Sequence, residues 1–284
     1  MDSTLQGNER GEGGVPIKDQ ELRFAGSVPA SYERLMVPLI FQPYADELAR
    51  RAADLQPGRI LETASGTGVV TRALRDALPR AQIVATDLNQ PMLDVAAEKL
   101  GSEAVRFLQA DAQELPFGDS SFDLVVCQFG AMFFPDKVRA HSEADRLLVQ
   151  GGHYLLAIWD SIERNPLTEA AQQVLVDHFP DDPPLFMREG PFGYSDATRI
   201  KADLHDAGFA TVEIETIEKR SRSPSAHDAA TALCHGTPMG VEVDDRAPGS
   251  LKRIFEEVKE SFARFETGHG IDAPMSAHIV TATR

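Results

Sequence analysis

Short apolar runs alternate with helical segments through the middle of the chain. The runs cover residues 59–63, 82–86, 105–109, 122–128 and 153–159. The helical patterns between them cover residues 67–78, 90–100 and 136–149. Nearly continuous apolar strands separated by helices are typical of a parallel sheet that is covered on both faces. The pattern therefore predicts an α/β fold.

The N-terminal part of the chain has a different pattern. Residues 1–20 are polar and rich in Gly and Glu, which predicts a disordered tail. Residues 21–56 show helical spacing, and we expect interruptions at Pro38 and Pro43 because proline breaks helix interiors.

The C-terminal part predicts two more strands, at residues 211–217 and 278–283, which makes seven. The helical and irregular stretch at about 225–267 lies between them, and we interpret it as an insertion into one domain spanning residues 57–284. The pair Gly151-Gly152 is expected to end the helix before the fifth strand as a left-handed cap.

Composition and charge argue against several classes of partner and site. The chain has 284 residues, a net charge of −16 and no basic patch, which argues against nucleic acid and against anionic membrane surfaces as partners. No apolar run reaches the length of a membrane span, and the start lacks a signal-peptide pattern, so we expect a cytoplasmic protein. Cys127 and Cys234 are too few for a disulfide scaffold or a zinc site, and we expect no metal.

The loop after the first strand carries the strongest clue. It reads Ala64-Ser65-Gly66-Thr67-Gly68, and its small residues let the backbone turn sharply and approach a ligand. In open parallel sheets ligands bind at the carboxyl ends of the strands, where the N–H groups of the next helix also point. The loop therefore predicts a nucleotide-like ligand.

Two ligand classes compete for this loop. A dinucleotide site favours G-x-G-x-x-G, but the position of the third glycine holds Thr71. Glu62 precedes the loop, where a pyrophosphate gains nothing from a carboxylate but a ligand with an amine and a sulfonium does. These features favour S-adenosylmethionine over NAD.

Two more carboxylates follow the next strands. Asp87 is expected to accept both ribose hydroxyls, with Leu88 and Met92 against the adenine, although NAD sites share such an acid. Asp111 is placed to accept from the adenine amino group, while the N–H of Ala112 donates to a ring nitrogen. The alternative for Asp111 is a helix N-cap.

Together these residues resemble a known family. Glu62-x-Ala64-x-Gly66-x-Gly68 resembles the E/D-x-G-x-G-x-G motif of class I S-adenosylmethionine-dependent methyltransferases. Its later motifs are matched by Asp87, the pair Asp111-Ala112, residues 122–126 and the turn at 147–152. The resemblance is greatest to the small-molecule branch related to ubiquinone and menaquinone methyltransferases. The chain departs from the pattern at Ala64, for the first glycine, and at Gln150, for a proline.

The resemblance implies a Rossmann-like, mostly parallel seven-stranded sheet with helices on both faces and an antiparallel last strand. It implies S-adenosylmethionine as cofactor, and a helical lid at residues 21–56 that carries Tyr32 over it. The cofactor-binding residues that we expect are Tyr32, Glu62, Ala64, Ser65, Gly66, Gly68, Asp87, Leu88, Met92, Asp111, Ala112 and Gln128.

The fourth strand and its loop are expected to face the methyl acceptor. Gln128 is an amide at the strand end that can bond the methionine part of the cofactor. An apolar acceptor pocket is predicted from Phe129, Met132, Phe133 and Trp159, for which core positions are the alternative. The D/N-P-P-Y/F motif is absent here, since Asp182-Pro183-Pro184-Leu185 falls in a later loop, which argues against nucleobase or glutamine N-methylation.

The predicted reaction is one displacement, in which the protein mainly aligns acceptor, methyl and sulfur. A base is needed only for an acceptor that keeps its proton. The candidates His153, Asp160, Tyr194 and His235 have no pairing that selects one, so no catalytic residue is predicted. The alternatives are a non-catalytic S-adenosylmethionine-binding protein and a nicotinamide-dependent reductase. The expected partner is a small-molecule substrate, and a homodimer remains open.

Overall fold

A mixed sheet organises the fold. The computed structural model describes residues 32–101 and 105–284, and the tail expected at 1–20 lies outside them. In the described part, eight strands form one sheet in the order β3-β2-β1-β4-β5-β8-β6, with β7 paired to β8. The strands are β1 (Arg59–Glu62), β2 (Gln82–Asp87), β3 (Val105–Gln109), β4 (Phe122–Gln128), β5 (Leu148–Trp159), β6 (Thr211–Ser223), β7 (Glu266–Thr267) and β8 (Gly270–Thr283).

The directions of the strands follow the prediction. β1 to β5 are mutually parallel, and β8 lies antiparallel between β5 and β6. The reversal of strand order lies between β1 and β4, which places their carboxyl ends at the usual ligand-binding edge. The α/β fold with an antiparallel last strand is thus confirmed, and the two-residue strand β7 is an addition that the sequence did not predict.

The glycine pair at the start of β5 was misassigned. The preceding helix ends at Leu147, and its cap Leu148 is extended, with φ −75° and ψ 145°. Gly151 does adopt a left-handed φ of 78°, but it lies inside β5, where the register against β4 shifts. Its N–H donates to Arg284 O at 3.2 Å, so the pair forms an irregularity in the strand rather than a helix cap.

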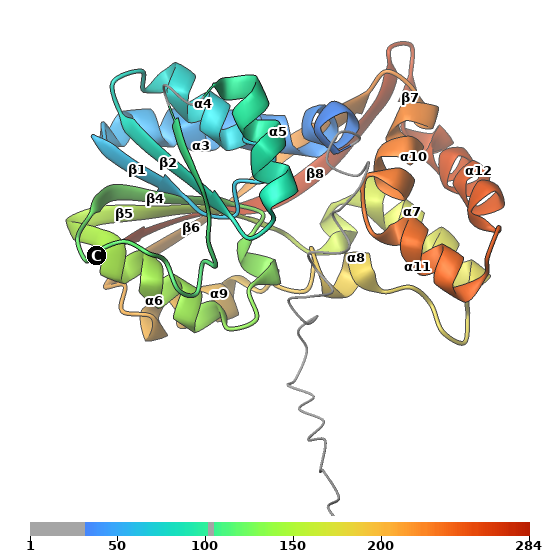
Figure 1. Cartoon of the computed structure of the whole chain (residues 1–284). Coiled ribbons are helices and arrows are strands. Elements are labelled where there is room, and N and C mark those ends of the chain that lie inside the picture. Colours follow the sequence, from blue (N-terminus) through green and yellow to red (C-terminus); the bar gives the residue numbers. More distant parts are fainter. Residues whose placement is uncertain (1–31, 102–104) are drawn as a thin grey trace, which may run out of the picture.

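Helices cover both faces of the sheet. α3, α4 and α5 lie on one face, and α6 and α9 on the other (Figure 1). Beyond the carboxyl ends of the parallel strands, α7, α8 and α10 to α12 form a second layer. The helices are α3 (Gln42–Leu55), α4 (Val69–Ala77), α5 (Gln90–Leu100), α6 (Lys137–Leu147), α7 (Pro166–His178), α8 (Phe186–Glu189), α9 (Ala197–Asp206), α10 (Ala226–His235), α11 (Met239–Arg246) and α12 (Leu251–Ser261).

The described part of the segment before β1 begins with the π-helix η1 (Tyr32–Phe41), which runs directly into α3. The prolines do not separate two helices as expected: Pro43 lies in the first turn of α3, where a missing N–H costs little, and Pro38 lies inside η1. Tyr44 anchors this segment, because its hydroxyl donates to Ile217 O at 3.1 Å and to Met275 O at 3.2 Å.

The stretch at 225–267 is helical, with α10 to α12 followed by the 3-10 turn η4 (Phe262–Phe265). It joins β6 to β8, whose ladder runs from Thr211↔Thr283 to Ser223↔Ile271. Its buried side chains belong to the same hydrophobic cluster as the sheet, as Val243 and Ile254 show. None of the described helices is long and apolar enough to cross a membrane.

Candidate functional site

The glycine loop leaves β1 and enters α4 with three left-handed residues. Ala64, Gly66 and Gly68 have φ values of 52°, 54° and 79°. A Cβ on Gly68 would lie 3.0 Å from Ala96 Cβ and 3.1 Å from a Leu100 methyl, so this glycine lets α5 pack closely. Gly66 has no atom within 4 Å of a Cβ position, so its side faces open space.

Ala64 replaces the first glycine of the motif, and a glycine in another loop leaves room for its side chain. A Cβ on Gly130, in the loop after β4, would lie only 2.4 Å from Ala64 Cβ. Real Cβ atoms do not approach this closely. The side chain at position 64 therefore requires glycine at position 130.

Glu62 lies beneath the loop rather than in the cavity wall. Its side chain is buried, and its Oε2 accepts a hydrogen bond of 2.6 Å from the Thr71 hydroxyl. Burial raises the pKa of Glu62 to about 8. Thr71, which stands where the dinucleotide motif has its third glycine, is thus the partner of Glu62. Glu62 does not line the cavity, so the wall does not offer the direct contact with a cationic ligand that we expected from the sequence.

Asp87 lies at the end of β2 and lines the cavity. Its Oδ2 accepts from the Gly66 N–H and its Oδ1 from the Asn89 N–H, both at 2.8 Å. Burial raises its pKa despite these hydrogen bonds. Each carboxylate oxygen keeps a lone pair for a further donor.

The turn after β3 continues this wall with Asp111, Ala112 and Gln113. Asp111 Oδ1 accepts from the Gln113 N–H at 2.8 Å, and a bridge pairs Asp111 with Glu114. No helix begins here in the described residues, so the N-cap alternative for Asp111 is wrong. We call this part of the wall the polar cradle; it consists of Ala64, Gly66, Asp87, Leu88, Met92, Asp111, Ala112 and Gln113.

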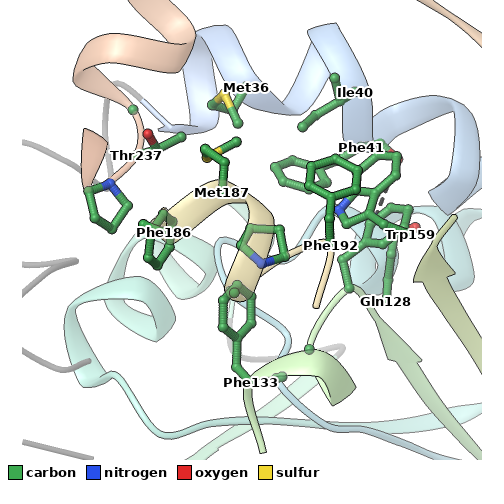
Figure 2. A pocket seen from close by; sticks show the side chains of 18 of the residues that line it. Met36, Ile40, Phe41, Gln128, Phe133, Trp159, Phe186, Met187, Phe192 and Thr237 are labelled. Carbon is green, nitrogen blue, oxygen red and sulfur yellow. Dashed lines mark hydrogen bonds between the residues drawn. The ribbon is translucent and has the colours of Figure 1, made fainter. Parts of the chain in front are cut away.

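The cavity continues from the cradle into a chamber with mostly apolar walls (Figure 2). At its base, Phe129 and Trp159 stack with ring centroids 3.8 Å apart and planes 5° from parallel. Gln128 lies beside them: its Nε2 donates to Phe41 O at 3.3 Å, while its buried Oε1 has no hydrogen-bond partner. We call this part the apolar chamber, formed by Met36, Ile40, Phe41, Phe129, Phe133, Phe134, Trp159, Leu167, Phe186, Met187, Phe192 and Met275 with neighbouring small and polar residues.

The structure separates the predicted residues into groups. The cavity wall contains eleven of the sixteen expected residues: Ala64, Gly66, Asp87, Leu88, Met92, Asp111, Ala112, Gln128, Phe129, Phe133 and Trp159. Four others lie outside the wall: Glu62, Ser65 and Gly68, which belong to the loop and its support, and Met132, which is buried in the core. The side chain of Tyr32 lies outside the described part of the chain.

None of the four candidate bases lines this cavity. His153, in the middle of β5, contacts Thr283, and Asp160 accepts from the Ser276 hydroxyl at 2.8 Å. Tyr194 donates to Asp203, and His235 stacks on Phe255. Among the described wall residues, the titratable side chains are Asp87 and Asp111, both in the polar cradle.

Sequence reasoning missed much of the apolar chamber. Phe186 and Met187 come from the four-residue helix α8, Met36 and Ile40 from η1, and Thr237 from the turn before α11. The segments are short, and they lie far apart in the sequence. Only their packing beyond the carboxyl ends of the strands brings them together, so no local pattern signals them.

Comparison with known proteins finds methyltransferases that are similar to this chain. Residues 61–156 match the model of a methyltransferase domain. Demethylmenaquinone methyltransferase of Thermus thermophilus is 44% identical over 114 residues, which are 38% of this chain and 51% of that protein. The enzyme of that name in Staphylococcus aureus is 27% identical over 217 residues, which are 70% of this chain and 88% of that protein. The chain spans about half the length of the first two relatives that it matches.

Solved structures agree on the fold. The YcgJ protein of Bacillus subtilis has a TM-score of 0.57 at 21% identity, with 85% of this chain and 98% of that chain covered. Phosphoethanolamine N-methyltransferase 2 of Haemonchus contortus, solved with S-adenosyl-L-methionine, has a TM-score of 0.60 at 16% identity, with 96% and 61% covered. Residues 61–156 are therefore similar to a methyltransferase domain, and the chain resembles the menaquinone-type methyltransferases in sequence and shares the fold of methyltransferase structures.

Proposed function

We propose that this protein transfers a methyl group from S-adenosylmethionine to a small, largely apolar acceptor. The observation that carries the proposal is that the polar cradle and the apolar chamber are parts of one cavity. The cradle has the carboxylates and backbone turns that an adenosine needs. The chamber has room beside it for a second molecule with little charge.

In this proposal the cofactor extends along the cradle. The free lone pairs of Asp87 accept the ribose hydroxyls, and Asp111 with Ala112 binds the adenine edge. Gln128 has a buried oxygen without a partner, which is an acceptor for the ammonium of the methionine part. The sulfonium then faces Phe129 and Trp159, whose rings attract a cation.

The acceptor is proposed from the chemistry of the apolar chamber. Among the described wall residues there is no Lys, Arg or His, so a phosphate or carboxylate on the acceptor would find no cation there. An acceptor without a strong charge fits this wall better. Demethylmenaquinone is the compound for which the similar enzymes are named. Its reduced quinol, which has an electron-rich ring carbon, is the first acceptor to test.

Transfer in such a cavity relies on alignment. Holding acceptor, methyl and sulfur in line can lower the barrier by roughly 7–11 kcal/mol. The acceptor attacks the methyl group with its own electron pair, and the methyl–sulfur bond breaks to leave S-adenosylhomocysteine. The two described titratable groups of the wall are both assigned to the cofactor, so a proton on the attacked atom is lost to solvent rather than to a described wall residue. We also propose that residues 57–284 act as one catalytic domain, with 21–56 as a lid and the insertion at about 225–267 closing the acceptor side.

Calorimetry with two variants tests the cofactor site. Asp87→Ala should weaken binding of S-adenosylmethionine by about 2 kcal/mol or more, because hydrogen bonds to a charged group are lost. Asp123→Ala is the matched control, since Asp123 also accepts from two backbone N–H groups, those of Gly58 and Arg59, but lies outside the cradle. Equal affinity of the Asp87→Ala variant and the unchanged protein would remove the ribose assignment.

The alternatives predict other outcomes. A nicotinamide-dependent reductase would bind NAD, whereas we expect no heat on titration with NAD. A non-catalytic binding protein would bind S-adenosylmethionine and its demethylated product without turnover of any acceptor. Formation of S-adenosylhomocysteine that depends on the acceptor separates this case from an enzyme.

A further inference from the structure

One carboxylate ties the N-terminal segment to the glycine loop. Glu33, in the first turn of η1, has a side chain that is 10% exposed. The Thr67 hydroxyl donates to its Oε2. Its Oε1 pairs with Arg72 of α4 at 3.0 Å and with Lys99 of α5 at 2.6 Å. Three elements of the cofactor side thus converge on one residue of η1.

The same helix supplies one wall of the apolar chamber. Met36, Ile40 and Phe41 line the cavity, and two hydrogen bonds hold this end of η1. Gln128 Nε2 donates to Phe41 O, and the Ser221 hydroxyl donates to Leu39 O at 3.1 Å. Glu33 at one end and these bonds at the other hold η1 across the site, from the glycine loop to β6.

We propose that Glu33 is a positioning residue for methyl transfer: by binding Thr67, Arg72 and Lys99 it fixes the glycine loop for the cofactor and η1 for the acceptor. This inference rests on the proposed function. Thr67 is 1% exposed and lies between Gly66 and Gly68, so a shift of its side chain moves the loop itself. If Glu33 is removed, the positive charges of Arg72 and Lys99 are no longer neutralised. They then lie beside the glycine loop and repel the positively charged cofactor that the loop is proposed to bind.

Glu33→Gln is the informative variant, because glutamine keeps the shape and can still accept from Thr67 but cannot pair with the cations. We expect calorimetry to show binding of S-adenosylmethionine roughly tenfold weaker or more, as the loss of charged hydrogen bonds implies. Glu33→Asp keeps the charge with a shorter reach, and its affinity should lie between those of the unchanged protein and Glu33→Gln.

Glu47→Gln is the matched control. Glu47 is similarly buried, at 11% exposure, and binds three cations, Arg50, Arg51 and Lys219, but it lies in α3 away from the cavity wall. Its loss should lower stability and leave affinity for S-adenosylmethionine unchanged. If Glu47→Gln weakened binding as much as Glu33→Gln, a general loss of stability would explain both, and the proposal would be overturned.

A double-mutant cycle supplies a readout that a purely structural role would not move. Thr67→Val removes the hydroxyl that donates to Glu33, so its effect on affinity should be largely absent in a Glu33→Ala background, in which no side chain at position 33 accepts from Thr67. Additive effects, or a Glu33→Gln variant that binds as the unchanged protein does, would refute the role of Glu33. An unchanged protein that does not bind S-adenosylmethionine would instead refute the proposed function.

Discussion

At the scale of single residues, the site depends on pairs that the motif alone does not show. Ala64 and Gly130 share one small space, and Glu62 and Thr71 share one buried hydrogen bond. In each pair, one residue replaces a glycine of a known motif: Ala64 replaces the first glycine of the methyltransferase motif, and Thr71 the third glycine of the dinucleotide motif. The partner of Ala64 is Gly130 in a distant loop, and the partner of Thr71 is Glu62 at the end of β1. The sequence identified Ala64, Glu62 and Thr71, but only the fold joins them to their partners.

The pair of Ala64 and Gly130 predicts a rescue. Gly130→Ala should destabilise the protein by about 1–3 kcal/mol, because overpacking forces the surrounding structure to move. Its φ of −103° suits alanine, so the cost comes from side-chain contacts and not from the backbone: the new Cβ would lie 2.4 Å from Ala64 Cβ and 3.0 Å from Cys127 Sγ. Adding Ala64→Gly removes the closer contact and should restore most of the lost stability in urea denaturation. Failure of the second change to restore it would show that the two Cβ positions do not compete.

Glu62 predicts a dependence of stability on pH. Burial raises its pKa from 4.5 to about 8 in the folded protein, so the folded state holds a proton that the unfolded chain releases. Without cofactor, its contribution to stability is present below about pH 4.5 and is lost as pH rises through about 8, by up to about 1.4 kcal/mol per pH unit.

Glu62→Gln should remove this dependence, because glutamine imitates the protonated acid and still accepts from Thr71. The free energy of unfolding of the variant, compared with that of the unchanged protein, should rise between about pH 5.5 and about pH 8. Urea denaturation at the two pH values measures it. Parallel stability curves for the two proteins would show that Glu62 ionises normally in the fold.

At the scale of elements, the parallel strands position the cradle, and the short segments beyond them build the acceptor wall. β1, β2 and β3 end at the loop, at Asp87 and before Asp111, as the apolar runs and their flanking residues predict. The wall from η1 and α8 was not predicted. A four-residue helix has no periodicity to detect, and its place depends on packing against α7.

Because α8 contributes to the wall of the apolar chamber, truncating a buried side chain in α8 should have a different effect from truncating one outside the wall. Met187→Ala, in α8, should raise KM for the acceptor and leave the affinity for S-adenosylmethionine unchanged, because Met187 lines only the apolar chamber. Leu175→Ala, in α7, is the control: Leu175 is buried outside the wall, so it should cost about 2–5 kcal/mol of stability without changing KM. Equal KM values for the two variants would contradict the assignment of α8.

At the scale of the whole molecule, the predicted architecture is largely correct. Alternating apolar strands and helices indicated the parallel sheet, and the last strand is antiparallel as the resemblance implied. The errors lie where local patterns are weak or ambiguous: Gly151 inside β5, Met132 in the core, and the unpredicted helices α7 and α9 between β5 and β6. Cofactor chemistry is concentrated in one loop and two strand ends, whereas the acceptor site is spread over the chain.

Transfer of a labelled methyl group tests the central claim most directly. The protein is incubated with methyl-labelled S-adenosylmethionine and demethylmenaquinone reduced to its quinol, and in parallel with a set of other uncharged, electron-rich aromatic acceptors. We predict that label passes to an apolar acceptor, that one S-adenosylhomocysteine forms for each methyl transferred, and that Asp87→Ala reduces the rate at a fixed low cofactor concentration. Tight binding of S-adenosylmethionine with all label retained in the cofactor, whichever apolar acceptor is present, would contradict the account.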